Sequence, residues 1–287
     1  MKIAITGATG QLGRLVIQSL QRLKTPHEIA ALVRHPEKAT PLFASNHIDI
    51  RQFDYDHPEQ LTTALEGIDK LLLISANEIG RRTPQHRAVI DAAKHSGVKH
   101  LVYTSLLNAD HSPLALAVEH RDTEAFIQHS GLSYTLLRNN WYVENYLAAL
   151  PQIIATGVLY GAAQDGKISA APRQDYAKAA AIVLNSTDPA HINQTYELAA
   201  SQSFKLQQLA QTISQISGKA VHYHNLSADD YRTGLNQAGL PAGLIDVIIN
   251  ADEQAVQGAL FSERRDLEQL LGHPSTQLAE TIVHALA

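Results

Sequence analysis

The chain has 287 residues, of which 45% are hydrophobic and 18% charged, with a formal net charge of −5 at pH 7. This length suits one or two globular domains, and the lack of a dense basic stretch argues against nucleic acid as a main partner. The sequence contains no cysteine, which excludes disulfides, thiolate nucleophiles and cysteine-based metal sites and favours a reducing compartment.

The first half of the chain alternates short apolar runs with amphipathic stretches, as expected of alternating strands and helices. The apolar runs are continuous, which is typical of strands covered by helices on both faces. The pattern predicts an α/β fold of the Rossmann type with a doubly wound parallel sheet. The predicted strands are Lys2–Thr6, Glu28–Arg34, His47–Phe53, Lys70–Ser75, Val98–Ser105 and Leu132–Arg138, and the predicted helices are Leu12–Leu23, Pro36–Ser45, Pro58–Glu66, Pro84–Ser96 and one within Ser112–Ser130.

Beyond about residue 140 this alternation becomes less regular. We therefore predict a Rossmann domain over residues 1–140 and a smaller C-terminal α/β lobe over residues 141–287, interleaved with the first because no linker separates them. The patterns predict helices at Trp141–Thr156, Gln174–Asn185, Leu206–Ile216, Leu267–Leu271 and Thr276–Leu286, and short strands at Gln194–Ala199 and Lys219–Leu226.

A glycine-rich turn directly follows the first predicted strand and opens the first predicted helix, with the sequence Gly7-Ala8-Thr9-Gly10-Gln11-Leu12-Gly13. Glycine is needed where the chain turns tightly, where the backbone approaches a pyrophosphate and where the helix packs closely. The helix N-terminus then offers unpaired N–H groups to phosphates. The motif predicts a dinucleotide site at these residues, against the alternative of a tight turn that binds nothing.

The second predicted strand ends in Arg34, with no acidic residue before Glu37. A site that prefers NAD carries an acid at this strand end, which binds the ribose 2′-hydroxyl. A guanidinium instead suits a 2′-phosphate, because it can bind phosphate oxygens bidentately. The sequence therefore predicts NADP, with NADPH as the reduced form, unless Arg34 is only a solvated charge.

Several short segments resemble one family, the NmrA-like branch of the atypical short-chain dehydrogenases. Within that branch the chain is most similar to the bacterial NAD(P)H:quinone oxidoreductases and less similar to the triphenylmethane reductases. The likeness covers essentially the whole chain and is carried by residues 7–13, Val33-Arg34, Leu72–Ser75, Val102–Ser105, Tyr134–Asn139, Asn145-Tyr146 and Gly272–Pro274.

This resemblance implies an NADPH-dependent reductase of quinones, whose smaller lobe encloses the substrate, and it suggests a homodimer. It also implies that the loops after the fourth and sixth strands flank the nicotinamide half of the cofactor. These loops add nine residues to the expected cofactor site: Ile74, Ser75, Ala76, Arg138, Asn139, Asn140, Trp141, Tyr142 and Val143.

The Tyr-x-x-x-Lys pair of typical short-chain dehydrogenases is missing from this sequence. Tyr103 is placed at the end of the fifth predicted strand, and the following predicted helix contains neither tyrosine nor lysine. His120 and Glu124 are four residues apart on that helix, where they could share a proton. We therefore take Tyr103 and His120 as the candidate catalytic residues.

The missing tyrosine–lysine pair narrows the class of acceptors that the protein could reduce. Hydride transfer to a quinone yields a phenolate-like anion, whose conjugate acid has a pKa near the tyrosine value of about 10. Hydride transfer to a simple ketone yields a far stronger base, which needs a general acid. A quinone reductase therefore requires mainly that cofactor and flat acceptor be held face to face. Aromatic side chains suit this task, and the candidates are Tyr103, Trp141, Tyr142 and Tyr146, unless they are only packing residues.

Two function classes stay open on these grounds. The first is an oxidoreductase that passes hydride from NADPH to quinones or similar flat electrophilic acceptors. The second is a redox-sensing regulator that binds NADP(H) without turnover, as some NmrA-like proteins do. The histidines show no spacing typical of a metal site, so we expect no metal. We also expect a cytoplasmic protein, since the chain shows neither a signal peptide pattern nor a long apolar stretch.

Overall fold

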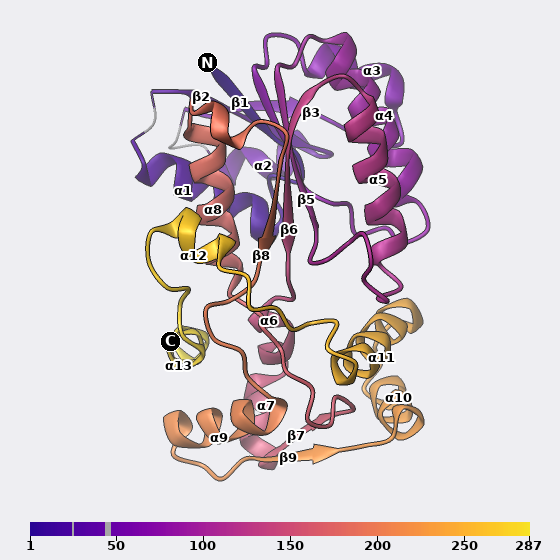
Figure 1. Cartoon of the computed structure of the whole chain (residues 1–287), viewed down its shortest axis with the longest axis vertical. Helices are drawn as coiled ribbons and strands as arrows, with labels where there is room; N and C mark the ends of the chain where they lie inside the picture. The colour runs from indigo at the N-terminus through magenta and orange to yellow at the C-terminus, as the bar shows by residue number, and fades with distance from the viewer. Residues whose placement is uncertain (25, 44–46) are drawn as a thin grey trace. The chain divides into compact units, whose positions relative to one another are not determined.

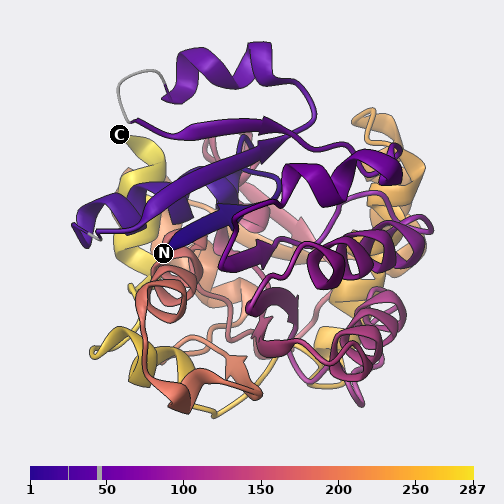
Figure 2. The same ribbon diagram turned by 90° about the horizontal axis from the view of Figure 1, so that it is seen from above.

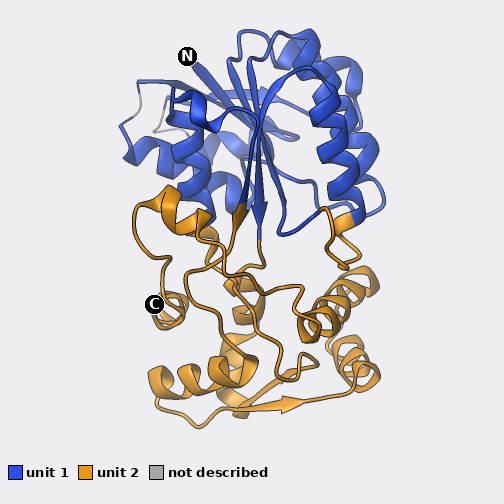
Figure 3. Cartoon of the chain, in the orientation of Figure 1, with its two compact units in different colours: residues 1–109, 118–139, 176–196 blue, residues 110–117, 140–175, 197–287 orange. Residues whose placement is uncertain are grey.

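The computed structural model describes residues 1–24, 26–43 and 47–287. The chain forms two compact units, drawn in different colours in Figure 3. Unit 1 comprises residues 1–109, 118–139 and 176–196, and unit 2 comprises residues 110–117, 140–175 and 197–287. The chain therefore passes between the units several times. That one part of the chain binds the cofactor and the other the substrate stays a prediction.

A seven-stranded sheet forms the centre of unit 1. Neighbouring strands from β3 to β6 pair in parallel, which confirms the predicted doubly wound Rossmann-type α/β fold. Because β1 lies between β2 and β4, the order of connection reverses there, and ligands of such sheets bind at the carboxyl ends of the strands at that point. The strands in spatial order are β3 (Asp49–Gln52), β2 (Glu28–Val33), β1 (Lys2–Ile5), β4 (Lys70–Leu73), β5 (His100–Leu106), β6 (Ser133–Asn139) and β8 (Gln194–Leu198).

Helices cover both faces of this sheet (Figure 1). One face carries α1 (Gln11–Arg22), α2 (Pro36–Phe43) and α8 (Arg173–Asn185), and the other carries α3 (Pro58–Ala64), α4 (Arg82–His95) and α5 (Ala117–His129). A short 3-10 helix, η1 (Pro189–His191), precedes β8. Figure 2 shows the sheet from above, where its strands cross at an angle because parallel sheets twist.

The hydrophobic core of unit 1 explains why its strands read as continuous apolar runs. Leu71 and Leu73 of β4 lie in one core cluster with Leu61 of α3 and Val89 of α4, all fully buried. Leu72, between them in the strand, is equally buried although successive strand residues point to opposite faces. Each such leucine contributes roughly 1.5–3 kcal/mol by leaving water. Burial on both faces thus produces the run that the sequence shows.

Unit 2 is built mainly of helices around a two-stranded parallel sheet. Helix α9 packs on both strands and also against α13, and α10 packs on α11. The strands are β7 (Val158–Gly161) and β9 (His222–Asn225), and the helices are α6 (Val143–Leu147), α7 (Leu150–Thr156), α9 (Leu206–Ser217), α10 (Ala228–Gln237), α11 (Ala242–Val256), α12 (Asp266–Leu271) and α13 (Leu278–Leu286).

The structure corrects the sequence prediction mainly in unit 2. The single helix predicted over Trp141–Thr156 is divided into α6 and α7, because Pro151 stands in the first turn of α7, where a missing N–H is tolerated, and not inside a helix. Strand β7 and helix α11 were not predicted. In unit 1 the last residues of the helix predicted over Pro36–Ser45 lie outside the described residues. No described helix is both long and apolar enough to cross a membrane.

Candidate cofactor and active site

The glycine-rich segment 7–13 forms the turn from β1 into α1. Gly7 has a φ of +56°, in the left-handed region that favours glycine. The Gly10 N–H donates to the Gly7 carbonyl oxygen over 2.9 Å, and Gly10 is the N-cap residue of α1, without any side-chain capping bond. The first N–H groups of α1 therefore have no partner within the helix, and Gly7, Gly10 and Gln11 are exposed beside them.

Close packing explains the remaining glycines of the turn. A Cβ atom at Gly13 would lie 2.4 Å from the Gly7 carbonyl oxygen, so α1 packs directly on the backbone of the turn. A Cβ atom at Gly10 would lie 3.1 Å from the same oxygen, and one at Gly7 would lie 3.9 Å from Cβ of Ile74. Around them, Ala8 and Leu12 are buried and Thr9 is half-buried. The turn is thus a narrow backbone cradle, which fits a dinucleotide pyrophosphate.

Arg34 follows β2 directly, and its side chain is 56% exposed. The Ala8 N–H donates to the Leu32 carbonyl oxygen over 3.5 Å, which places the glycine-rich turn against the end of β2. Arg34 Nη1 lies 3.8 Å from Oε1 of Glu78. An exposed guanidinium therefore stands beside the turn, as a 2′-phosphate site requires.

Side chains hold the backbone of the loop that follows β4. Its first three N–H groups, those of Ile74, Ser75 and Ala76, donate to Thr6 Oγ1, Thr104 Oγ1 and His86 Nε2 respectively, each over 2.9 Å. The Ala76 carbonyl oxygen accepts from Arg82 Nε over 2.7 Å. Both polar groups of Ala76 are therefore fixed by side chains of α4, and this loop has a defined position beside the turn.

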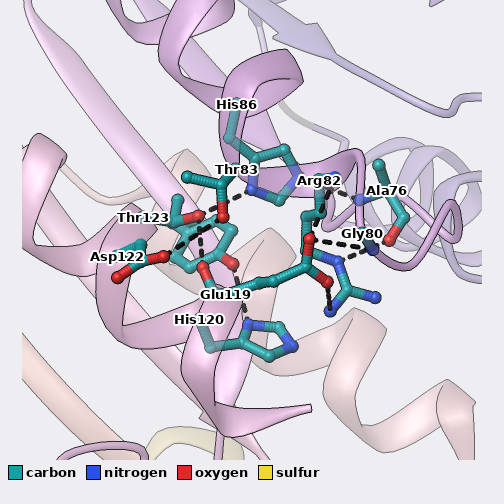
Figure 4. Close-up of polar contacts among 10 residues, drawn as sticks. Ala76, Gly80, Arg82, Thr83, His86, Glu119, His120, Asp122 and Thr123 are labelled. Carbon is teal, nitrogen blue, oxygen red and sulfur yellow. Dashed lines mark hydrogen bonds and ion pairs between the residues drawn. The ribbon is translucent and has the colours of Figure 1, made fainter.

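The far end of this loop is held by Glu119 of α5 (Figure 4). Glu119 Oε1 accepts the N–H groups of Gly80 and Arg82, each over 3.1 Å. Its Oε2 lies 3.6 Å from Nη1 of Arg82, and the two side chains are only 15% and 7% exposed. A largely buried ion pair thus connects the loop to α5.

His86 links the same loop to Thr123 of α5, as Figure 4 shows. Because His86 Nε2 accepts from the Ala76 N–H, its Nδ1 carries the proton and donates to Thr123 Oγ1 over 2.9 Å. Burial, together with the nearby charge of Arg82, lowers the pKa of His86 to about 3. His86 is therefore neutral at physiological pH and serves as a fixed acceptor for the loop.

The placement predicted for Tyr103 is wrong. Strand β5 continues to Leu106, because its last residues pair with the end of β6, so Tyr103 lies mid-strand and is fully buried. Its hydroxyl lies 2.7 Å from Nδ1 of His120. Burial raises the pKa of Tyr103 and lowers the pKa of His120 well below its usual value. The ring therefore cannot form an exposed platform for an acceptor, but the hydroxyl can orient His120.

Arg138 and Glu124 form a buried ion pair. Arg138 Nε and Nη2 reach the two carboxylate oxygens of Glu124 over 2.9 and 2.7 Å, and Ser105 donates to Oε1 over 2.5 Å. Glu124 therefore bonds to Arg138 and Ser105, whereas His120 bonds to Tyr103. The shared proton that the sequence suggested for His120 and Glu124 is not supported by these contacts. Asn139, the next residue of β6, is buried, and its Oδ1 has no hydrogen-bond partner in the described chain.

The remaining predicted cofactor residues, 140–143, belong to unit 2. Asn140 is buried, and its Nδ2 donates to the Leu260 carbonyl oxygen over 2.9 Å. Val143 is also buried. Trp141 and Tyr142 are half-buried, and the guanidinium of Arg173 lies 4.5 Å from the ring centre of Tyr142. Asn140 and Val143 thus contribute to packing, whereas Trp141 and Tyr142 are only partly buried.

Sequence reasoning missed the side chains that fix the loop after β4, above all His86, Arg82 and Glu119. The sequence offered no spacing signal for them, since they come from two helices that meet only in the fold. Among the described residues, no group of three or more histidines and carboxylates is placed to hold a metal ion.

Comparison with known proteins extends these observations. A family model described as NAD(P)H-binding matches residues 7–187. Quinone oxidoreductase 2 of Escherichia coli (strain K12) is 51% identical over 282 residues, which cover 98% of each chain.

Two solved structures match nearly the whole fold. The Escherichia coli NADPH-dependent quinone oxidoreductase, solved in complex with NADPH, superposes with a TM-score of 0.94 at 51% identity and covers 99% of this chain and 100% of its own. The triphenylmethane reductase of a Citrobacter species gives a TM-score of 0.94 at 36% identity, covering 100% and 99%. Both relationships were predicted from the sequence motifs and are confirmed. The chain belongs to the NAD(P)H-binding family.

Proposed function

We propose that this protein is an NADPH-dependent oxidoreductase that transfers hydride to quinones or similar flat electrophilic acceptors. The observation that carries the proposal is the 51% identity, over 98% of both chains, to a quinone oxidoreductase. That relative binds NADPH in a structure superposing on this chain with a TM-score of 0.94. In this proposal the protein acts in the cytoplasm, and it forms a homodimer as related folds do.

The cofactor is held mainly by unit 1. The cradle of segment 7–13 takes the pyrophosphate, because its glycine backbone allows close approach and the N-terminus of α1 favours negative charge. Arg34 takes the 2′-phosphate. The fixed loop at Ile74–Ala76 and the unpartnered Oδ1 of Asn139 position the nicotinamide half.

When bound, NADPH supplies the hydride, and one proton from solvent completes the conversion of quinone to hydroquinone. His120 acts as a neutral hydrogen-bond donor in this reaction. In this proposal the Tyr103 hydroxyl, 2.7 Å from His120 Nδ1, donates to that nitrogen, which leaves the proton of the ring on Nε2. A neutral imidazole suffices because the hydroquinone anion is a weak base, with a conjugate acid near pKa ~10.

Steady-state turnover with a benzoquinone and with a simple ketone tests this proposal. We expect NADPH to be oxidised in one-to-one ratio with hydroquinone formed, and the ketone to be inert because no residue replaces the missing tyrosine–lysine pair. Tight NADPH binding without oxidation by any benzoquinone would instead support the non-catalytic redox sensor. Reduction of the ketone at a comparable rate would contradict the proposed reaction class.

A further inference from the structure

In unit 1 two arginines share the carboxylate of Glu78. Arg34 Nη1 lies 3.8 Å from its Oε1, and Arg81 Nη1 lies 3.0 Å from its Oε2. Gln85 Nε2 also donates to Oε2 over 3.1 Å. One negative group therefore bridges two guanidinium groups beside the end of β2.

Arg81 reaches this carboxylate from a fixed point of the backbone. It is the N-cap residue of α4, and its N–H donates to the Glu78 carbonyl oxygen over 3.1 Å. The residues on either side of it, Gly80 and Arg82, both donate their N–H groups to Glu119. The side chain itself is 58% exposed and also pairs with Asp56 over 2.6 Å. Hydrogen bonds thus hold the backbone at Arg81 in place, while its guanidinium stays accessible.

A phosphate monoester resembles the Glu78 carboxylate in being an anion with acceptor oxygens, but it has more charge and more oxygens. Such a group carries a charge of about −1.5 to −2 at pH 7 and three acceptor oxygens, whereas a carboxylate carries one charge and two oxygens. Two guanidinium groups around one anion form an arrangement that a phosphate would occupy more favourably. Arg34 is already assigned to the 2′-phosphate in the proposed function, and Arg81 shares its carboxylate partner.

We propose that Arg81 is a second ligand of the 2′-phosphate of NADPH, and that Glu78 competes with this phosphate for Arg34 and Arg81. The inference rests on the proposed function, since it specifies how the cofactor is selected. Glu78 lowers affinity for NADPH in two ways. It must release both arginines before the phosphate binds, and its charge repels the phosphate. NADH lacks the 2′-phosphate and leaves the bridge intact.

Equilibrium binding of NADPH and NADH to purified variants, without acceptor, tests the proposal. Arg81→Ala should weaken NADPH binding roughly 10–100-fold, the range expected for loss of a charged hydrogen bond, and leave NADH binding unchanged. Arg81→Lys should lose part of this affinity, because lysine keeps the charge without the bidentate fork. Glu78→Gln should tighten NADPH binding roughly 2–5-fold, the scale of an exposed ion pair.

Arg87→Ala is the matched control. Arg87 lies on the same helix, its side chain is 65% exposed, and it pairs with Asp91 over 3.9 Å, so the variant removes the same charge away from Glu78. Thermal melting verifies that each variant is folded. The proposal is overturned if Arg81→Ala weakens NADPH no more than Arg87→Ala, if it weakens NADH equally, or if Glu78→Gln weakens NADPH. A wild-type protein that fails to bind NADPH would refute the proposed function itself.

Discussion

The two loops that follow β1 and β4 reach the same edge of the sheet but acquire their shapes in opposite ways. The glycine-rich turn at 7–13 is formed by backbone packed on backbone, with a Cβ position at Gly13 only 2.4 Å from the Gly7 carbonyl oxygen. The loop at 74–82 is held by side chains, including His86 and Glu119. The first loop leaves N–H groups at the start of a helix for a ligand, whereas the second uses its N–H groups to fix itself.

The largest effect is expected from breaking the backbone cradle. Gly10→Val should abolish NADPH binding in a folded protein, because the exposed side chain occupies the pyrophosphate position next to the start of α1. Gly13→Ala should reduce thermal stability as well, since its Cβ atom would lie 2.8 Å from Cα of Ala8. Calorimetric titration and thermal melting of both variants separate the two roles. Normal NADPH affinity in folded Gly10→Val would place the cofactor elsewhere.

Removing a side chain that holds the loop at 74–82 should instead lower the stability of the protein more than its affinity for NADPH. Glu119→Gln leaves the charge of Arg82 largely buried without its carboxylate, which should lower the free energy of unfolding by about 3–5 kcal/mol. NADPH binding should weaken less than in Gly10→Val, because only the position of the loop is loosened.

Asp122→Asn is a matched control on the same helix. Asp122 is exposed and, within the described part of the chain, accepts only a 3.3 Å bond from Thr83, so its loss should change stability by less than about 0.5 kcal/mol. Urea titration of both variants makes the comparison. Equal stability of Glu119→Gln and Asp122→Asn would show that the second loop does not depend on its side chains.

Acid should destabilise the protein through buried histidines. Burial lowers the pKa of His86 to about 3 and that of His100 to about 4, and holds the pKa of His120 well below its usual value. Between pH 6 and 5 the unfolded chain therefore binds about three more histidine protons than the folded one. Burial raises the pKa of Asp252 to about 6, so this residue binds a proton in the folded state and offsets about one of them.

The net uptake of about two protons on unfolding should lower the free energy of unfolding by roughly 3 kcal/mol per pH unit in this range. Stability should be fully present above the unfolded histidine pKa of about 6.5 and decline below it. Urea titrations at several pH values measure the slope. His100→Gln should reduce it by about one proton, and a slope independent of pH would contradict the buried, neutral histidines.

The smallest effect is expected at Tyr103. Tyr103→Phe should reduce turnover less than about 10-fold, because it removes only the hydroxyl that orients His120 and no general acid is needed. The pH profile of turnover, compared for this variant, His120→Ala and wild type, distinguishes the roles. A loss of turnover of about 10²–10⁴-fold in either variant would match removal of a true general acid and contradict the proposal that none is needed.

The contrast between the loops also explains what the sequence could predict. Glycine spacing directly after an apolar run identified the turn at 7–13, and continuous apolar runs identified the buried strands, because both signals are local. The position of Tyr103 was misjudged, since the length of β5 depends on pairing with Arg138 and Asn139 of a distant strand. The partners of Glu119 and Glu124 were not predictable, because a buried ion pair depends on which helices meet.

Single-turnover transfer from NADPH deuterated at C4 of the nicotinamide tests the central claim, hydride transfer to a quinone, most directly. We predict that mixing with a benzoquinone oxidises the bound cofactor in one exponential phase, with a primary isotope effect for one of the two C4 positions and a rate independent of pH near neutrality. Enzyme-bound NADPH that stays reduced in the presence of excess benzoquinone would contradict the claim.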